Sequence, residues 1–428
     1  MQIYVVKPGD NLSAIAQRFG ITPNELVKVN RIPNPNNLVE GQTIVIPSVH
    51  APYTIKPGDT MWLLAKRNKL KPQDLLDANP GVNPNKLRVG QSINLTVSRP
   101  PARTIEVNAY IDPLAVGGHT LPPIQAAGAN LTYLSLFSYR VTPAGEIIGP
   151  DDSEIVSTAR SFGEAPVLVV TNFDGTNFSP QLAHAVMSEA QVKERLIQNI
   201  LNHLRARNYQ GVNVDFERVR PEDRELLNGF MADVAARMRQ AGYPFSTALA
   251  PKTSDWQTGE WYGAHDYRAH GQIADYVIIM TYEWGWSGGP PYAVAPIVNV
   301  RQVLDYAVTV IPRKKIMMGV PLYGYDWTLP YVAGGPWART ISPQQAIEIA
   351  AAHGVAIRYD TKLQSPWFNY RDSNGREHTV WFEDARSINA KFNLVNEYGL
   401  RGVSYWALGH DFPQNWLVLA GRFKIKKY

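Results

Sequence analysis

The sequence predicts an α/β protein: a (β/α)₈ TIM barrel that carries a small α+β insertion and follows two βααβ modules. Three observations lead to this prediction. A strand–helix pattern occurs twice near the N-terminus, eight apolar strand-like segments alternate with helical patterns after residue 103, and more than 50 extra residues separate the last two of these strands. A chain of 428 residues is long enough for several domains.

The composition is that of a globular protein, with 45% hydrophobic and 18% charged residues. The absence of cysteine excludes disulfides and thiolate chemistry. Because the nine histidines are scattered, we expect neither a metal site nor a cofactor. No apolar run approaches the roughly 18 residues of a membrane helix, and MQIYVVKPGD lacks the basic and apolar regions of a secretion signal.

The first two predicted domains, 1–48 and 51–97, are copies of one pattern. YVVKPGDNLSAIA (4–16) recurs as YTIKPGDTMWLLA (53–65), and an offset of 49 residues holds without a gap to the end of each unit. Each unit reads as a strand, a PGD turn, a helix, a second short helix after Pro23 or Pro72, an Asn/Pro loop and a closing strand.

The PGD opening, the N-P-N loop and the L-x-x-GQ-x-I ending make both units similar to the LysM domain. This resemblance implies binding of N-acetylglucosamine-containing glycans between the loop after the first strand and the loop before the last. The implied residues are Gly9, Asp10, Asn11, Asn30, Asn36 and Leu38, and in the second unit Gly58, Asp59, Thr60, Asn79, Asn85 and Leu87. Alternatively, these residues serve turn geometry and helix capping, which we favour for Asp10 and Asp59.

The net charge of the chain lies on the two repeats. Residues 1–98 carry 11 Lys/Arg against 6 Asp/Glu, whereas the rest balances at 31 against 31. A basic surface suits an anionic cell wall better than neutral chitin. Nucleic acid is a less favoured partner because the basic residues are spread out and aromatic residues are few there.

The predicted barrel, 103–428, follows a short Pro-rich linker at 98–103. Near-continuous apolar strands with helices between them indicate a parallel barrel, whose active site lies at the carboxyl ends of the strands. The eight predicted strands are 105–111, 131–139, 166–173, 211–217, 245–251, 275–283, 315–324 and 402–408.

The fourth strand, GVNVDFE, ends in two carboxylates. Asn213, Asp215 and Glu217 alternate with apolar residues and therefore share one face. A helical pattern begins at Pro221, so Glu217 lies between a strand and a helix. The acids could instead cap the strand or pair with Arg218 and Arg220.

Aromatic side chains end other strands: the sixth finishes in MTYEW (280–284), the seventh in PLY (321–323) and the eighth in YW (405–406). Rings at one rim are typical of a sugar cleft, although Tyr323 and Tyr405 could equally pack in the core. We expect Trp406 to form the floor of the pocket.

Residues 103–428 resemble family 18 glycoside hydrolases through GVNVDFE, MTYE and the late Trp406. The resemblance implies that Glu217 is the general acid, that Asp215 polarises the 2-acetamido group of the substrate, and that Tyr282 binds its carbonyl oxygen. That oxygen would be the nucleophile in a retaining, substrate-assisted reaction. Implied substrate-binding residues are Met280, Glu283, Trp284, Tyr323 and Trp406.

The motif departs from the family pattern. Gln210 and Asn213 stand where the family has two further acids, and Glu283 replaces an aspartate. We expect Asn213 to hydrogen-bond Asp215 without sharing its charge, and the protein to be an active enzyme with an altered pH profile.

The insertion, about 325–383, contains a helical pattern, ISPQQAIEIAAAHG, and three strand patterns with a DSNGR turn. Such an insertion walls one side of the cleft in many family members. Trp367, Tyr370 and Trp381 would line that wall or, as we favour for most of them, form the core of the insertion.

The whole arrangement resembles the cortical-fragment-lytic enzymes of bacterial spores, which are N-acetylglucosaminidases. It implies a protein made in the mother-cell cytoplasm without a signal peptide and laid down around the spore, with peptidoglycan strands and cortex fragments as partners and no nucleic acid or membrane partner. The alternatives are a chitinase or chitooligosaccharide hydrolase, and a non-catalytic glycan-binding spore coat protein. The sequence does not indicate an oligomeric state.

Overall fold

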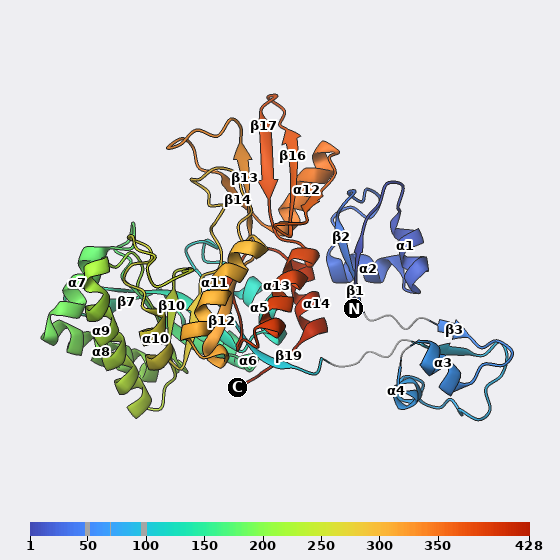
Figure 1. The fold of residues 1–428 in the computed structure, drawn as a ribbon, viewed down its shortest axis with the longest axis horizontal. Helices are drawn as coiled ribbons and strands as arrows, with labels where there is room; N and C mark the ends of the chain where they lie inside the picture. The colour runs from blue at the N-terminus through green and yellow to red at the C-terminus, as the bar shows by residue number, and fades with distance from the viewer. Residues whose placement is uncertain (48–51, 69, 96–100) are drawn as a thin grey trace.

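The computed structural model describes residues 1–47, 52–68, 70–95 and 101–428. The predicted module ends at 48, 51 and 97 and half of the predicted linker, 98–100, lie outside these residues. Figure 1 shows two small N-terminal modules beside a larger α/β body, from which a small sheet projects. In the described part of the chain, no helix is long and apolar enough to cross a membrane.

The body is a closed barrel of parallel strands, as the sequence predicts. Each strand pairs with the next, and β5 closes the ring by pairing with both β6 and β18. The barrel strands are β5 (Thr104–Ile111), β6 (Tyr133–Val141), β8 (Ala165–Thr171), β9 (Val212–Asp215), β10 (Phe245–Leu249), β11 (Tyr276–Ile279), β12 (Ile316–Pro321) and β18 (Gly402–Trp406). A short β7 (Ile147–Ile148) pairs antiparallel with the end of β6.

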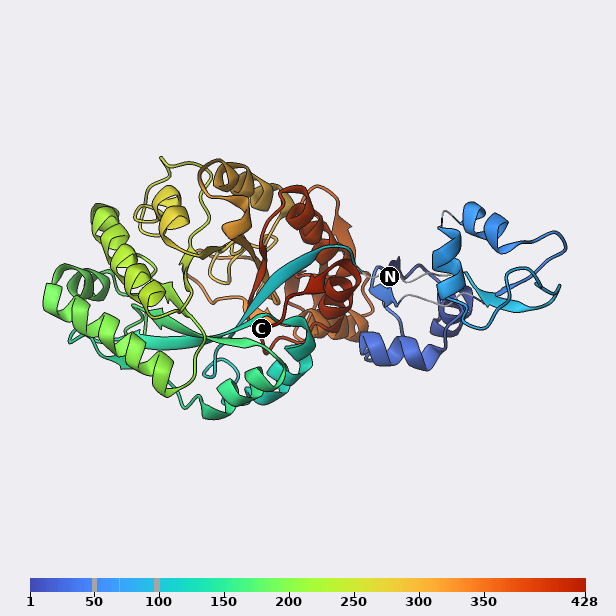
Figure 2. The same ribbon diagram turned by 90° about the horizontal axis from the view of Figure 1, so that it is seen from below.

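Helices surround these strands (Figure 2). In α8, for example, the buried residues Leu196, Ile200 and Leu204 recur every four residues and turn one face to the barrel. The helices are α5 (Leu121–Ala127), α6 (Ser153–Ser161), α7 (Pro180–Ser188), α8 (Ala190–Ala206), α9 (Arg224–Gln240), α10 (Tyr267–Ile273), α11 (Ile297–Val310), α13 (Ala385–Glu397) and α14 (Pro413–Arg422), with 3₁₀ turns η1 (Gly128–Asn130), η2 (Pro221–Asp223) and η3 (Arg313–Lys315).

The C-terminal segment covers the amino end of the barrel. β19 (Lys424–Ile425) pairs with the first residues of β5, and Lys426 Nζ donates to the buried Glu106 at 2.9 Å. The opposite, carboxyl end of the strands is therefore the open one.

The insertion forms an antiparallel sheet between β12 and α13. Its elements are β13 (Gly324–Thr328), β14 (Arg339–Ile341), α12 (Pro343–His353), β15 (Arg358–Asp360), β16 (Ser365–Arg371) and β17 (Glu377–Trp381), in the strand order β14-β13-β17-β16-β15. The predicted helix and three strands are present, whereas the sequence analysis missed the short β13 and β14. Tyr370 is buried in the core of the insertion, and Trp367 stacks on Trp381 with ring centroids 5.6 Å apart.

Both modules have the predicted βααβ order. The first contains β1 (Gln2–Val5), α1 (Leu12–Phe19), α2 (Pro23–Asn30) and β2 (Thr43–Ile46), and the second β3 (Pro52–Thr54), α3 (Met61–Arg67), α4 (Pro72–Asp77) and β4 (Ser92–Asn94). In each, the first and last strands pair antiparallel, and each has its own buried apolar cluster.

Candidate active site

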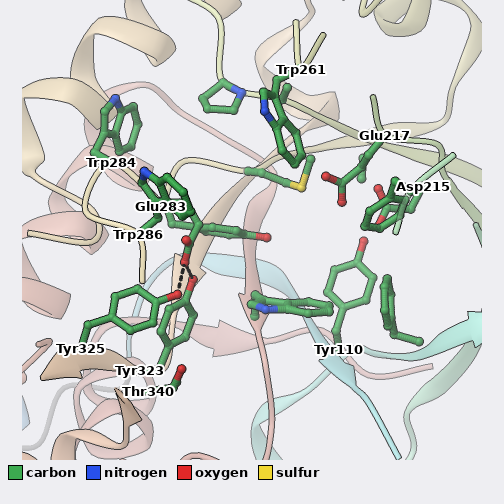
Figure 3. A pocket seen from close by; sticks show the side chains of 18 of the residues that line it. Tyr110, Asp215, Glu217, Trp261, Glu283, Trp284, Trp286, Tyr323, Tyr325 and Thr340 are labelled. Carbon is green, nitrogen blue, oxygen red and sulfur yellow. Dashed lines mark hydrogen bonds between the residues drawn. The ribbon is translucent and has the colours of Figure 1, made fainter. Parts of the chain in front are cut away.

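A pocket of about 590 Å³ opens at the carboxyl ends of the barrel strands (Figure 3). All the substrate-binding residues predicted in the barrel line it, as do Asp215, Glu217 and Tyr282. The lining residues are Tyr110, Phe137, Phe178, Asp215, Glu217, Ala248, Ala250, Pro251, Trp261, Tyr262, Met280, Tyr282, Glu283, Trp284, Trp286, Tyr323, Tyr325, Thr340, Trp406 and His410.

The backbone around Glu217 is fixed by two buried side chains. Asn172, which follows β8, donates from Nδ2 to the Glu217 carbonyl at 2.8 Å and accepts from the Glu217 N–H at 3.0 Å. His265 accepts the Ala250 N–H on Nδ1, so its Nε2–H donates to the Phe216 carbonyl at 3.0 Å. Burial lowers the pKa of His265 to about 4 and keeps the ring neutral.

The two carboxyl groups are shielded from solvent, and the charge of Asp215 raises the cost of ionising Glu217. Burial raises the pKa of Asp215 to about 7. Burial and the Asp215 charge together raise the pKa of Glu217 well above its usual range, against a weaker opposing effect of Arg218. The site therefore holds a protonated Glu217 beside an Asp215 that ionises near neutral pH.

Asn213 does not make the expected hydrogen bond to Asp215. Its Oδ1 accepts from Tyr110 OH at 3.0 Å, and its Nδ2 donates to Ser246 Oγ at 3.0 Å. Among the described residues, Asp215 Oδ1 has no hydrogen-bond partner although it is buried. The expectation was wrong because Tyr110 on β5, a strand that does not pair with β9, and Ser246 on the adjacent β10 offer the buried amide a donor and an acceptor.

Glu283 lies at the open rim, but its carboxylate turns inward (Figure 3). The hydroxyls of Tyr323 and Tyr325 both donate to its Oε1, the second at 2.8 Å. Burial raises the pKa of this carboxyl, and the two hydrogen bonds act in the opposite direction. The group is thus held by two tyrosines.

Aromatic rings form much of the pocket wall. Trp406 packs against Phe137 and Tyr110 with centroid distances of 4.8 and 5.6 Å. Trp261 and Trp286 remain about half exposed at the rim, at 47% and 45%. Burial raises the pKa of Tyr282, so its hydroxyl stays protonated and available as a donor.

The structure distinguishes the core and pocket alternatives for Tyr405 and Tyr323, and it gives Arg218 a partner other than the two acids. Tyr405 is a core residue, because it is fully buried and donates to Asn415 at 3.1 Å, whereas Tyr323 lines the pocket. Arg218 pairs with Glu260 at 2.9 Å.

Several residues of the site were not predicted from the sequence. Tyr110 is the penultimate residue of the first predicted strand, and Trp261 and Trp286 follow the fifth and sixth, so aromatic residues near these strand ends were a usable signal. Tyr325 and Thr340 belong to the missed strands β13 and β14, which bring the insertion into the pocket wall.

In the two modules, the residue that follows each aspartate in the sequence is the N-cap of the next helix. Asn11 accepts from Ala14 N–H at 2.8 Å and Thr60 from Leu63 N–H at 3.2 Å. Asp10 instead accepts from Tyr4 OH at 2.7 Å, and Asp59 from Tyr53 OH at 2.6 Å. The capping role favoured for the aspartates was therefore wrong. Each aspartate also accepts the backbone N–H of the lysine three residues earlier, at 2.8 Å, and so closes the PGD turn.

Asn30 and Asn79 are also structural. Asn30 is fully buried, donates to the Leu26 and Val45 carbonyls and accepts from Val45 N–H at 2.7 Å. Asn79 repeats this pattern with Leu75 and Asn94. Both side chains are buried and both hydrogens of each Nδ2 are used inside the module, so neither residue belongs to the predicted glycan groove.

The other predicted groove residues lie at the surface of the modules. Asn36 and Asn85 are exposed, Leu38 and Leu87 are half-buried, and Gly9 and Gly58 have positive φ values of 81° and 85° in the exposed PGD turns. In the described residues, no group of three or more His, Asp or Glu side chains could hold a metal ion.

Family comparisons agree with this geometry. The sequence model for glycosyl hydrolases family 18 matches residues 153–411, and the LysM model matches 4–47 and 53–96.

The chain belongs to glycosyl hydrolases family 18.

Relatives match this chain over its whole length. The chain is 53% identical to a cortical fragment-lytic enzyme of Bacillus subtilis (strain 168), over 100% of this chain and 99% of the relative. The crystal structure of a spore cortex-lytic enzyme from Bacillus megaterium QM B1551 superimposes with a TM-score of 0.89 at 42% identity, covering 100% of this chain and 99% of the other.

A more distant structure matches about three quarters of this chain. A chitinase from Chromobacterium violaceum superimposes with a TM-score of 0.67 at 29% identity, covering 74% of this chain and 99% of the chitinase.

Proposed function

We propose that this protein hydrolyses N-acetylglucosaminyl linkages in spore-cortex peptidoglycan, as a retaining, substrate-assisted N-acetylglucosaminidase. The family 18 barrel supplies glycosidase chemistry, and the full-length relatives are named for lysis of spore cortex or its fragments. The observation that carries the proposal is the buried, protonated Glu217 beside Asp215 in an aromatic pocket.

Glu217 acts as the general acid. Its proton passes to the glycosidic oxygen as the bond from that oxygen to C1 of the N-acetylglucosamine breaks. Its raised pKa keeps that proton in place until the substrate arrives. The backbone clamp from Asn172 and His265 holds the carboxyl at the strand end.

The nucleophile comes from the substrate. The third carboxylate of the pocket, on Glu283, accepts hydrogen bonds from two tyrosines. In our mechanism the acetamido carbonyl oxygen attacks C1 and forms an oxazolinium ion, positioned by Tyr282 OH. The ionised Asp215 stabilises the positive N–H of this ion, and water, deprotonated by Glu217, then opens it with net retention at C1.

The LysM modules hold the protein on the wall. Their excess of basic residues favours an anionic peptidoglycan, and the groove candidates that stay exposed are the PGD turns and the Asn/Pro loops. Residues 1–48 and 51–97 would be the two anchors and 103–428 the catalytic domain. We place the protein in the coat or cortex region of the spore, after synthesis in the mother cell.

A second candidate is a chitinase. The chitinase from Chromobacterium violaceum matches the barrel, and a chitin chain offers the same 2-acetamido nucleophile. Digestion of chitin oligomers at a rate equal to that on cortex fragments would favour this function.

The deciding experiment is mass spectrometry of cortex muropeptides after incubation with the wild type and with Glu217→Gln. We expect fragments with N-acetylglucosamine at the new reducing end, formed by the wild type and reduced ~10²–10⁴-fold with the variant. Both proteins should still sediment with insoluble peptidoglycan. Sedimentation without cleavage by the wild type would identify a non-catalytic binding protein, and equal cleavage by both would refute the role of Glu217.

A further inference from the structure

The first LysM module is built into the catalytic domain. Val45 in β2 is 1% exposed and belongs to the same buried cluster as the barrel core, and Val39 is 6% exposed within the core of the insertion. The module lies beside α13 and α14 (Figure 1). The equivalent residues of the second module are Arg88, which is exposed, and Asn94, which is half-buried.

The loop between α2 and β2 is held at both ends. At its start, Arg31 pairs with Asp411 at 2.9 Å and Gln344 donates to the Arg31 carbonyl at 2.9 Å. At its end, Ile357 N–H donates to the Glu40 carbonyl at 2.8 Å, and Arg386 donates to the Gly41 carbonyl at 3.1 Å.

Gly41 shows how close this contact is. A Cβ atom on Gly41 would lie 1.8 Å from the Ile357 carbonyl oxygen. Gly90, its counterpart in the second module, has a similar φ of +86° against +82°, yet a Cβ there meets no described atom within 4 Å. The two glycines therefore have the same backbone requirement and differ in what lies next to them.

The loop between α2 and β2 forms one side of the predicted glycan groove of the first module. Residues 33–37, between the two clamps, are exposed and include the candidate Asn36. Asp411, the ion-pair partner of Arg31, directly follows His410 in the sequence. His410 lines the catalytic pocket, and the centroid of its ring lies 5.7 Å from that of Tyr323. One loop thus connects the groove of the first module to the wall of the active site.

We propose that the first LysM module is a fixed glycan subsite of the catalytic unit. It holds a long peptidoglycan strand in one register relative to the cleft and thereby selects which linkage reaches Glu217. This inference rests on the proposed function, because it requires that the module and the cleft bind the same strand.

The test compares two matched pairs of variants in the full-length protein. Val39→Arg with Val45→Asn gives the first module the residues that the second module already tolerates, and Arg88→Val with Asn94→Val is its reciprocal control. Gly41→Ala inserts a methyl group into the contact, whereas Gly90→Ala imposes the same backbone cost without it. Each protein is assayed on long cortex strands and on an aryl chitooligosaccharide short enough to occupy only the pocket.

We expect the first-module variants to lose roughly tenfold or more in kcat/KM on long strands, because the tethered subsite loses its effective concentration. They should also release a broader range of fragment lengths, while the short substrate is cleaved as by the controls. Equal losses on both substrates would show that the contact only braces the barrel, and unchanged cleavage of long strands would show that the register is set elsewhere. Either result overturns the inference but leaves the proposed activity in place, because that activity fails only if the wild type cleaves nothing.

Discussion

The side chain of Asn172 hydrogen-bonds both the carbonyl and the N–H of the Glu217 backbone. The amide Nδ2 donates to the Glu217 carbonyl at 2.8 Å, and Oδ1 accepts the Glu217 N–H at 3.0 Å. The same Nδ2 donates to the Ser179 carbonyl at 3.0 Å. Because Asn172 follows β8 and Glu217 follows β9, one side chain joins the ends of two neighbouring barrel strands beside the pocket. The position of the acid thus depends on a residue that does not line the pocket.

Replacing Asn172 by Ala should lower kcat on the order of 10- to 100-fold while KM changes little, because the acid is misplaced and the sugar contacts remain. The lost hydrogen bonds should also reduce the free energy of unfolding by about 1–3 kcal/mol. Asn172→Asp keeps the acceptor for the Glu217 N–H and loses the donor, so it should have an intermediate kcat. A rise in KM with kcat unchanged would contradict the positioning role.

The sequence was informative where a side chain's neighbours along the chain determine its position. GVNVDFE alternates and precedes a helical pattern, so Asp215 and Glu217 could be placed together at a strand end, and the repeated strand–helix order placed that end at the barrel mouth. The sequence was misleading for Asn30 and Asn213, because these buried amides bind groups on β2 and on β5 and β10, and which partners they meet is decided by packing. The packing of the first module against the barrel and its insertion could not be predicted from the sequence for the same reason. Val39 and Val45 read as ordinary apolar residues until their counterparts Arg88 and Asn94 are compared with them in space.

The pH dependence of kcat/KM should follow the two acids. Catalysis needs Asp215 ionised and Glu217 protonated, so the rate should fall as pH drops through about 7 and fall again where Glu217 loses its proton. Asp215→Asn should cost about 10²- to 10³-fold in kcat because the oxazolinium ion loses its stabilising charge. It should also shift the alkaline limb to lower pH, because the Asp215 charge no longer raises the pKa of Glu217. An alkaline limb that stays in place would show that the two carboxyl groups do not interact.

The charge of Arg218 should influence the alkaline limb of the pH profile of kcat/KM. Its guanidinium lowers the pKa of Glu217, pairs with Glu260 and lies 5.2 Å from the centre of the Trp261 ring. Arg218→Gln should therefore move the alkaline limb to higher pH and raise KM as Trp261 loses support. Glu260→Gln leaves the cation unneutralised and should move the limb the other way. Shifts in the same direction, measured at low salt where exposed charges are least screened, would contradict this account.

Asn213→Asp tests whether the departure from the family motif matters. The new carboxyl group would be fully buried and would replace the Nδ2 donor to Ser246. If it ionises, its charge raises the pKa of Asp215, so the acidic limb of kcat/KM should move to higher pH. Asn213→Leu, which removes the polar group without adding charge, is the control for lost hydrogen bonding. A profile identical to that of the wild type would show that this position does not set the pH optimum.

Glu164, far from the pocket at the start of β8, should make the fold less stable at alkaline pH. The residue is 2% exposed, and in the described part of the chain neither of its carboxyl oxygens has a hydrogen-bond partner. Burial raises its pKa from 4.5 to about 8, with a smaller opposing effect of Lys427. Between these two values the folded state binds a proton that the unfolded state has released, so the free energy of unfolding falls as pH rises, by up to about 1.4 kcal/mol per pH unit.

Glu164→Gln keeps the shape of the side chain and removes its titration. Denaturant unfolding at pH 6 and pH 8.5 should therefore show a smaller loss of the free energy of unfolding for the variant than for the wild type. Equal losses would mean that Glu164 ionises in the folded state at little cost, which requires that water or Lys427 solvates the carboxylate at the amino end of the barrel.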